Sequence, residues 1–263
     1  MPIDPFQTLT RDLRELGGQR VWSLMVSLFG DLAQDAGSQI AGPRLSAIMT
    51  LLDVRPEAAR VALHRLRNDD WITSQKSGRT SLHSLTAKGR AESAAASPRI
   101  YADPNVKDQD WQCLLLPQAD PDRANSLAAE GFTALTPRLF FGPDALQAPA
   151  DSLPLSASSV PEWLQAQLEP KALKDSYAAL LEALDALMQR LPPADDLDPI
   201  RIAVLRCLIV HNWRRLVLKH PALPSPLVSP DWVGLHCHQR VHDLLQAYPR
   251  PTLQEIAQPA NAA

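Results

Sequence analysis

The sequence predicts an α+β fold that is mostly helical and that has a winged helix-turn-helix near its N-terminus. Apolar residues recur at helical spacing through the first 70 residues and again through the last third of the 263-residue chain. A basic helical run is followed by two strand-like runs that are joined by Lys76-Ser-Gly-Arg79. In the middle of the chain, strand-like and helical runs alternate over short connections, which predicts a small ferredoxin-like domain.

The first helices follow from apolar spacing and from the positions of prolines. Residues 1–18 are expected to be a polar leader that is partly helical. The run 20–36 has the apolar periodicity of an amphipathic helix. Gly42-Pro43 opens a second helix, because proline is suited to the first turn.

A third helix begins at Pro56, after a short turn, and completes the order of a helix-turn-helix. One face of this helix is apolar, and the opposite face carries Arg60, His64 and Arg67. Thr86 is expected to cap a connecting helix that ends at Ser97-Pro98. The apolar stripe of the third helix comprises Ala59, Ala62, Leu63 and Leu66.

A basic helix followed by a hairpin with a basic tip is typical of a winged helix that binds DNA. Arg60, His64 and Arg67 are expected to read or flank bases, and Val61 could contact a thymine methyl group. Arg65 is expected to reach a phosphate or to pair with an acidic residue. The predicted DNA-binding residues are Arg44, Arg55, Arg60, Val61, His64, Arg65, Arg67, Lys76, Ser77, Gly78, Arg79 and Thr80.

The net charge of −3 conceals an asymmetry along the chain. Residues 1–100 carry 13 Lys/Arg and 10 Asp/Glu, whereas the remainder carries 13 and 19. Residues 55–90 alone hold 8 basic and 3 acidic side chains, an excess that suits a phosphate backbone. A solvated helix face would have the same charge, so charge alone leaves both interpretations open.

The chain is expected to divide into four parts. The winged-helix domain with its leader spans 1–97, and the ferredoxin-like domain spans 98–146. A Pro/Ser-rich linker at 147–171 precedes a helical domain at 172–263 that is assigned to effector binding and dimerisation. The strands are expected at 111–116, from 131 and at 138–141, and the helices at 120–130, 172–191, 199–219 and 235–247.

No metal site, cofactor or membrane segment is expected. The three cysteines are scattered without a CxxC pair, which supports neither a disulfide framework nor a structural zinc site. His238 and His242 have the i, i+4 spacing of a helical metal site, but surface or pocket histidines are the favoured interpretation. The polar start is unlike a signal peptide and no apolar run has membrane length, so a cytoplasmic protein is expected.

The stretch His211-Asn-Trp-Arg-Arg215 has two interpretations. A tryptophan with two arginines can clamp an anionic, partly aromatic ligand, because guanidinium groups bind carboxylate or phosphate and indole stacks. An interdomain ion-pair patch around a buried Trp213 is the interpretation that the chemistry alone favours.

Several short motifs together resemble the PaaX family of bacterial repressors, which control phenylacetate degradation genes and respond to phenylacetyl-coenzyme A. The resemblance covers most of the chain and departs from the family at His64 and His220. The matching residues are Leu28-Phe29-Gly30-Asp31, Arg60, Arg65-Leu66, Trp71-Ile72, Gly78-Arg79, Leu85-Thr86, Gly89-Arg90, Arg99-Ile100-Tyr101, Leu208 to Arg215, Pro221, Leu223-Pro224 and Asp231-Trp232.

The resemblance implies a ligand-responsive repressor of an aromatic-acid operon. It implies a homodimer on a palindromic operator, a central domain similar to the CRISPR-associated Cas2 fold, and release from DNA by an acyl-coenzyme A such as phenylacetyl-coenzyme A. The residues assigned to this effector are His211, Trp213, Arg214 and Arg215.

Two other functions remain open, although no enzyme is expected. A Cas2-like nuclease that depends on a metal would need clustered carboxylates, for which Asp103, Asp108 and Asp110 are the nearest candidates. These residues are equally well explained as a solvated loop. The winged helix could also serve only for protein contacts, and salt-dependent DNA affinity would argue against that function.

Overall fold

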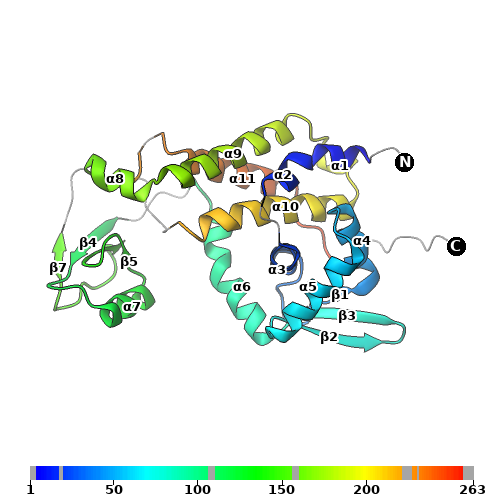
Figure 1. Cartoon of the computed structure of the whole chain (residues 1–263), viewed down its shortest axis with the longest axis horizontal. Coiled ribbons are helices and arrows are strands. Elements are labelled where there is room, and N and C mark those ends of the chain that lie inside the picture. The colour runs from blue at the N-terminus through cyan, green and yellow to red at the C-terminus, as the bar shows by residue number, and fades with distance from the viewer. Residues whose placement is uncertain are drawn as a thin grey trace.

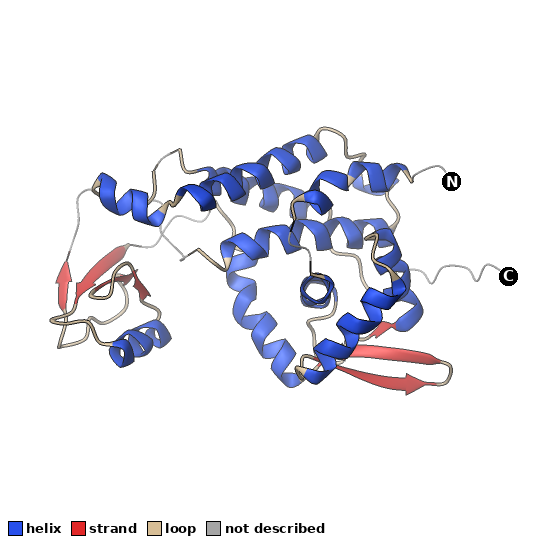
Figure 2. Ribbon diagram, viewed as in Figure 1, coloured by secondary structure: helices blue, strands red, loops and turns tan. Residues whose placement is uncertain are grey.

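The computed structural model describes residues 4–17, 20–105, 110–155, 160–220, 227–229 and 231–256. Helices predominate, and strands form two small antiparallel sheets (Figure 2), which confirms a mixed fold that is mostly helical. Helix α10 lies among the other long helices, with a hairpin at one end of the molecule and a small sheet unit at the other (Figure 1). No helix in the described ranges is long and apolar enough to cross a membrane.

The N-terminal helices and the hairpin follow the predicted order, and the short strand β1, which was not predicted, precedes α4. Helix α3 is seen end-on in Figure 1, and it contacts α5, α6 and α10. The first sheet has the strand order β1-β3-β2 and is antiparallel throughout. The helices and strands of this N-terminal part are α3 (Val21–Leu32), β1 (Ile40–Ala41), α4 (Gly42–Leu51), α5 (Pro56–Asn68), β2 (Ile72–Ser77) and β3 (Thr80–Leu85).

The hairpin has a tighter turn than the four residues predicted for it. Ser77 pairs with Thr80, which leaves Gly78 and Arg79 as a two-residue turn. Gly78 has φ +60°, a conformation that glycine adopts without the steric penalty of a side chain. The short turn fixes the register of β2 and β3 and places the basic residues at the tip.

Helix α6 (Ala87–Ile100) connects the hairpin to the rest of the chain. The predicted cap is confirmed, since Thr86 Oγ1 accepts a hydrogen bond from the Gly89 backbone N–H at 3.0 Å. The predicted end at Ser97-Pro98 is wrong. Proline in the last turn removes only one helical donor, and the helix closes when the Tyr101 N–H donates to the Ser97 carbonyl at 2.9 Å.

Replacing Gly89 by alanine should destabilise the protein by about 1–3 kcal/mol, the range expected for overpacking. A Cβ at this position would lie 2.2 Å from the Trp71 carbonyl oxygen, so α6 would have to move away from the hairpin. Urea unfolding measures the effect. Gly30→Ala is the matched control, because its nearest neighbour would be Ser93 Oγ at 3.5 Å, and it should keep or raise stability. Equal stability of both variants would contradict the packing argument.

The leader packs against the C-terminal helices, which its polar composition does not indicate. It forms α1 (Pro5–Leu9) and α2 (Arg11–Glu15), with Phe6 and Leu13 buried. Asp12 pairs with Arg190 at 2.6 Å, and the Asn212 side chain donates to the Leu13 carbonyl at 2.9 Å. These contacts join the leader to the turn that follows α9 (Lys171–Met188) and to α10 (Pro199–Val217), and both helices pack with α11 (Val233–Ala247).

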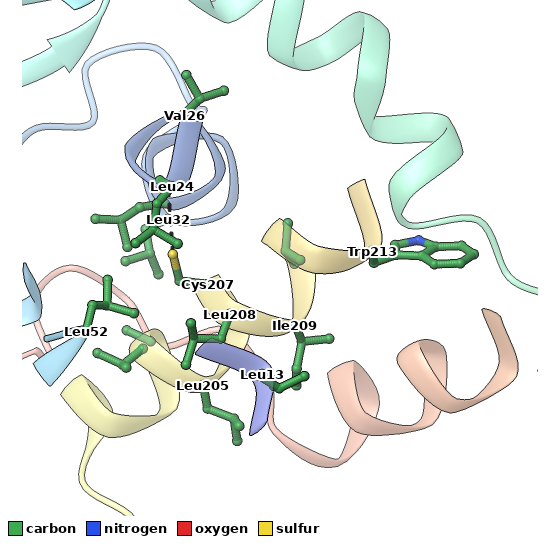
Figure 3. Close-up of a cluster of buried hydrophobic side chains, with 14 of the residues drawn as sticks. Leu13, Leu24, Val26, Leu32, Leu52, Leu205, Cys207, Leu208, Ile209 and Trp213 are labelled. Atoms are coloured by element: carbon green, nitrogen blue, oxygen red, sulfur yellow. Dashed lines mark hydrogen bonds between the residues drawn. The ribbon is translucent and has the colours of Figure 1, made fainter. Parts of the chain in front are cut away.

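One hydrophobic core extends from the leader and N-terminal helices into the C-terminal helices (Figure 3). Leu205, Leu208 and Ile209 of α10 are fully buried in it. Cys207 Sγ lies 3.7 Å from the Leu24 carbonyl oxygen, on the side of α10 that faces α3. The segments 1–97 and 172–263 therefore share their main core instead of each enclosing a separate one.

A buried ion pair crosses this shared core. Asp31 on α3 accepts two hydrogen bonds of 3.0 Å from Arg206 on α10, and both side chains are almost fully buried. Tyr101 donates to the same carboxylate at 2.8 Å. Arg206 also donates to the carbonyls of Leu245 and Tyr248, so one charged cluster links the N-terminal helices, α10 and α11.

The central unit is a four-stranded antiparallel sheet with the order β5-β6-β4-β7. Asp120 caps α7 (Pro121–Glu130), as predicted, by accepting hydrogen bonds from two backbone N–H groups. Within the described residues 144–152 no second helix separates β6 from β7, so the ferredoxin-like assignment stays a prediction. The strands are β4 (Trp111–Leu115), β5 (Thr133–Ala134), β6 (Leu139–Pro143) and β7 (Leu153–Leu155).

The segment 147–171 is more than a linker. It contributes β7, which pairs with β4, and it contains α8 (Glu162–Leu168). Leu164 and Leu168 of α8 pack with Cys113 on one face of the sheet, whereas Leu127 of α7 packs with Leu114 on the other. The few apolar residues of this Pro/Ser-rich segment thus help to cover one face of the sheet, while α7 covers the other.

Candidate nucleic-acid interface

Helix α5 buries the predicted stripe and exposes the predicted basic face. Ala62 and Leu66 are buried, and Ala59 and Leu63 are partly buried. Pro56 opens the helix, as predicted, and Arg55 is the exposed residue before it. The stripe packs on α3, which fixes the direction of the opposite face.

The exposed face of α5 brings together the side chains predicted to contact bases. Arg60, His64 and Arg67 are all exposed, and Val61 beside them is 70% exposed. Among the residues that the structure describes, Arg60 makes only a long 3.7 Å ion pair with Glu57, and both side chains are about three-quarters exposed. Such a pair contributes little to stability, so the guanidinium is available to a partner.

Arg65 lies to one side of this face. Its guanidinium sits 4.3 Å from the ring centroid of Trp22 on α3 and pairs with Asp69 at 3.5 Å. The expectation that Arg65 pairs with an acidic residue is confirmed. The sequence did not identify Trp22 as its second partner, because that contact joins two helices. Arg65 holds α5 against α3 through a cation–π contact.

The hairpin places a second set of basic residues beyond the helices (Figure 1). Lys76, Ser77, Gly78 and Arg79 at its tip are exposed, and Thr80 is partly buried. The base of the hairpin is fixed by His83, which is buried and lies 2.8 Å from Ser74 Oγ. Burial and the nearby charge of Arg67 lower the pKa of His83.

Arg44 differs from the other predicted DNA-binding residues. It lies on α4, is partly buried, and its Nε has no hydrogen-bond partner within the described part of the chain. Its position on the second helix of the unit is compatible with a phosphate contact at the edge of a bound duplex.

The predicted effector residues do not form one clamp. His211 is fully buried, with Nδ1 3.2 Å from Ser27 Oγ, and burial lowers its pKa to about 4. Trp213 is buried, donates to the Ile100 carbonyl at 3.0 Å and stacks on His238. Arg215 donates to the Gly17 carbonyl on the leader, whereas Arg214 donates to Ser27 Oγ at 3.1 Å. The burial of Trp213 agrees with the favoured interpretation, in which a buried tryptophan lies within an interdomain patch.

The residues considered for metal chemistry have other partners. His238 Nε2 lies 2.9 Å from the Ala102 carbonyl, and His242 is 3.9 Å from Asp103. Asp103 accepts hydrogen bonds from Asn105, while Asp108 lies outside the described residues. Across the described ranges, no three His, Cys, Asp or Glu side chains gather in a way that could hold a metal ion.

Comparisons with known proteins identify the relatives of the chain. Residues 20–89 match the family model of the PaaX-like protein, and residues 168–256 match that of the PaaX-like protein C-terminal domain. The transcriptional repressor PaaX of Escherichia coli (strain K12) is 30% identical over 251 residues, which cover 85% of this chain and 79% of that protein.

A solved structure shows that the fold as a whole occurs elsewhere. The uncharacterized protein Rv0674 from Mycobacterium tuberculosis has a TM-score of 0.51 and 18% sequence identity, over 88% of this chain and 95% of that one. The family models and the repressor confirm the resemblance seen in the motifs. They also confirm the expectation that the chain is a regulator and not an enzyme. The chain belongs to the PaaX-like family of transcriptional repressors.

Proposed function

We propose that the protein represses transcription by binding double-stranded DNA through a winged helix-turn-helix formed by α3 to α6 and the first sheet. The observation that carries the proposal is the exposed face of α5, where Arg60, Val61 and His64 lie together. Helix α5 would enter the major groove, where arginine can donate two hydrogen bonds to guanine. Lys76 and Arg79 at the hairpin tip would hold the phosphate backbone.

The proposal extends to the operator and to the regulated genes. The resemblance to the PaaX family supports an aromatic-acid operon of the phenylacetate type. A homodimer would bind a palindromic operator, since a two-fold axis presents two copies of α5 to two half-sites. An acyl-coenzyme A such as phenylacetyl-coenzyme A would release the protein, provided that it binds the conformer with weak DNA affinity more tightly.

Arg60→Ala should lower the affinity for the operator about tenfold or more and relax the preference at one base position. Arg79→Ala should instead weaken binding about equally for all sequences and reduce its salt dependence. Gel-shift titrations on DNA upstream of the protein's own gene measure both effects. Arg190→Ala is the control, because this residue lies in the turn after α9, in an ion pair with Asp12. Unchanged affinity and preference in Arg60→Ala would refute the role of α5.

A further inference from the structure

A cavity of about 190 Å³ lies between α3, α6 and α10. Val26 and Gly30 of α3, Ala96 and Ile100 of α6, and Val210 and Leu218 at α10 form its mostly apolar wall. An apolar cavity of about 150 Å³ is large enough to bind benzene. This cavity therefore has room for a single ring or a short acyl chain, but not for a nucleotide.

Arg214 is the exceptional side chain in this wall. It is partly buried, and its only hydrogen bond in the described part of the chain goes from Nη1 to Ser27 Oγ at 3.1 Å. Two other arginines of α10 have carboxylate partners, namely Asp4 for Arg201 and Asp31 for Arg206, and Arg215 donates to the leader, away from the cavity. Arg214 forms no ion pair with any described residue, and burial lowers its pKa.

Several other polar groups of the wall are already engaged. Tyr101 donates to Asp31 at 2.8 Å, and Ser97 donates to the Ser93 carbonyl at 2.9 Å. Glu92 is exposed and accepts a hydrogen bond from the Trp71 indole at 2.7 Å. The guanidinium has five N–H donors, so Arg214 is the group whose hydrogen-bonding capacity a ligand could complete.

We infer that this cavity binds a small apolar acyl group, with an oxygen of its carboxylate or thioester accepting hydrogen bonds from Arg214. An apolar body fills the wall, while the charged donor fixes the orientation of the ligand. The same acyl group can arrive as a free carboxylate or as the acyl end of a thioester. The regulatory meaning of the site rests on the proposed function, but binding itself does not.

The position of the cavity gives the ligand a route to the DNA-binding face. Its wall includes Trp71, which precedes β2, and α6, which follows β3. Arg99 near the end of α6 donates to the carbonyls of Val217 and His220 at the end of α10. A ligand that separates α6 from α10 would strain these contacts and turn the hairpin relative to the helical core.

Thermal unfolding of the full chain with two acyl probes, phenylacetate and phenylacetyl-coenzyme A, tests the inference. A ligand that binds only the folded protein must raise the melting temperature. At least one of the two acyl probes should bind, and Arg214→Gln should weaken it about tenfold or more. A response to phenylacetate alone identifies the free acid as the source, and a response to the thioester alone identifies the carried acyl group. Failure of both acyl probes overturns the site.

Two pairs of variants distinguish a specific loss of ligand binding at the cavity from a general effect on folding. Ala96→Leu should block binding by filling the cavity, whereas Ala95→Leu, at an exposed neighbouring position, should not. Arg215→Gln should keep the full response, because that residue contacts the leader instead. Equal binding by wild type, Arg214→Gln and Ala96→Leu would overturn the inference.

A parallel gel shift with the wild-type protein distinguishes this failure from failure of the proposed function. Ligand binding without any DNA binding would refute the repressor and leave the cavity site standing. DNA binding together with no response to either acyl probe would refute the site alone.

Discussion

Asp31→Ala is expected to lower the free energy of unfolding by about 3–5 kcal/mol, the range for breaking a buried ion pair by removing one partner. The substitution would leave the Arg206 guanidinium buried without a counter-charge and would remove the acceptor of the Tyr101 hydroxyl. The penalty is large because the buried arginine stays desolvated, and the attraction of the carboxylate no longer offsets the cost of that desolvation. Urea unfolding at neutral pH measures the change.

The matched comparison is Asp12→Ala, which breaks the exposed ion pair with Arg190. Its expected effect is about 0–1 kcal/mol, since solvent screens exposed pairs. Replacing both members of the buried pair, in Asp31→Leu/Arg206→Met, should recover much of the loss, because no unpaired charge remains. A single Asp31→Ala variant as stable as Asp12→Ala would show that water reaches Arg206.

Lowering the pH from 7 to 5 should remove about 2 kcal/mol of stability through His211 alone. Its pKa is about 4 in the folded protein, where burial and then the charges of Arg214 and Arg215 oppose protonation, against about 6.5 when unfolded. The unfolded chain therefore takes up the proton first. The contribution is complete above about pH 6.5 and is lost as the pH falls toward 4.

The comparison of wild type with His211→Gln isolates this contribution, because glutamine cannot titrate and still offers a hydrogen bond to Ser27. His220 and His238 also have pKa values lowered mainly by burial, so the wild-type profile alone would combine several groups. Chemical denaturation at several pH values should give a flatter stability profile for His211→Gln. Parallel profiles would assign the acid sensitivity to other groups.

The sequence was most informative where a single residue type dictates local geometry. Gly42-Pro43 opens α4, Pro56 begins α5, and Thr86 caps α6, as predicted. The periodicity of α5 also separated its buried face from its exposed one, because helical spacing alone decides which side chains share a face. Fold class, helix order and the exposed basic residues could therefore be predicted.

Contacts between distant segments could not be predicted in the same way. Residues 211–215 point in different directions around α10, and the sequence does not say which neighbour each one meets. Arg214 and Arg215 are the same residue type at adjacent positions, yet Arg214 lines a cavity and Arg215 contacts the leader. The burial of Phe6 and Leu13 was missed for a similar reason, since their partners lie almost 200 residues away.

The shared core has a consequence for the protein while it is being synthesised. Helix α6 ends at Ile100, and α10, which completes the core around α3, begins only at Pro199. At typical synthesis rates of about 5–20 residues per second, those intervening residues take roughly 5–20 s to emerge. The part of α3 that faces α10 must remain uncovered on the ribosome during that time, whereas the face of the central sheet that packs on α7 can close its small core first. The order of folding along this chain is thus expected to differ from the order of its sequence.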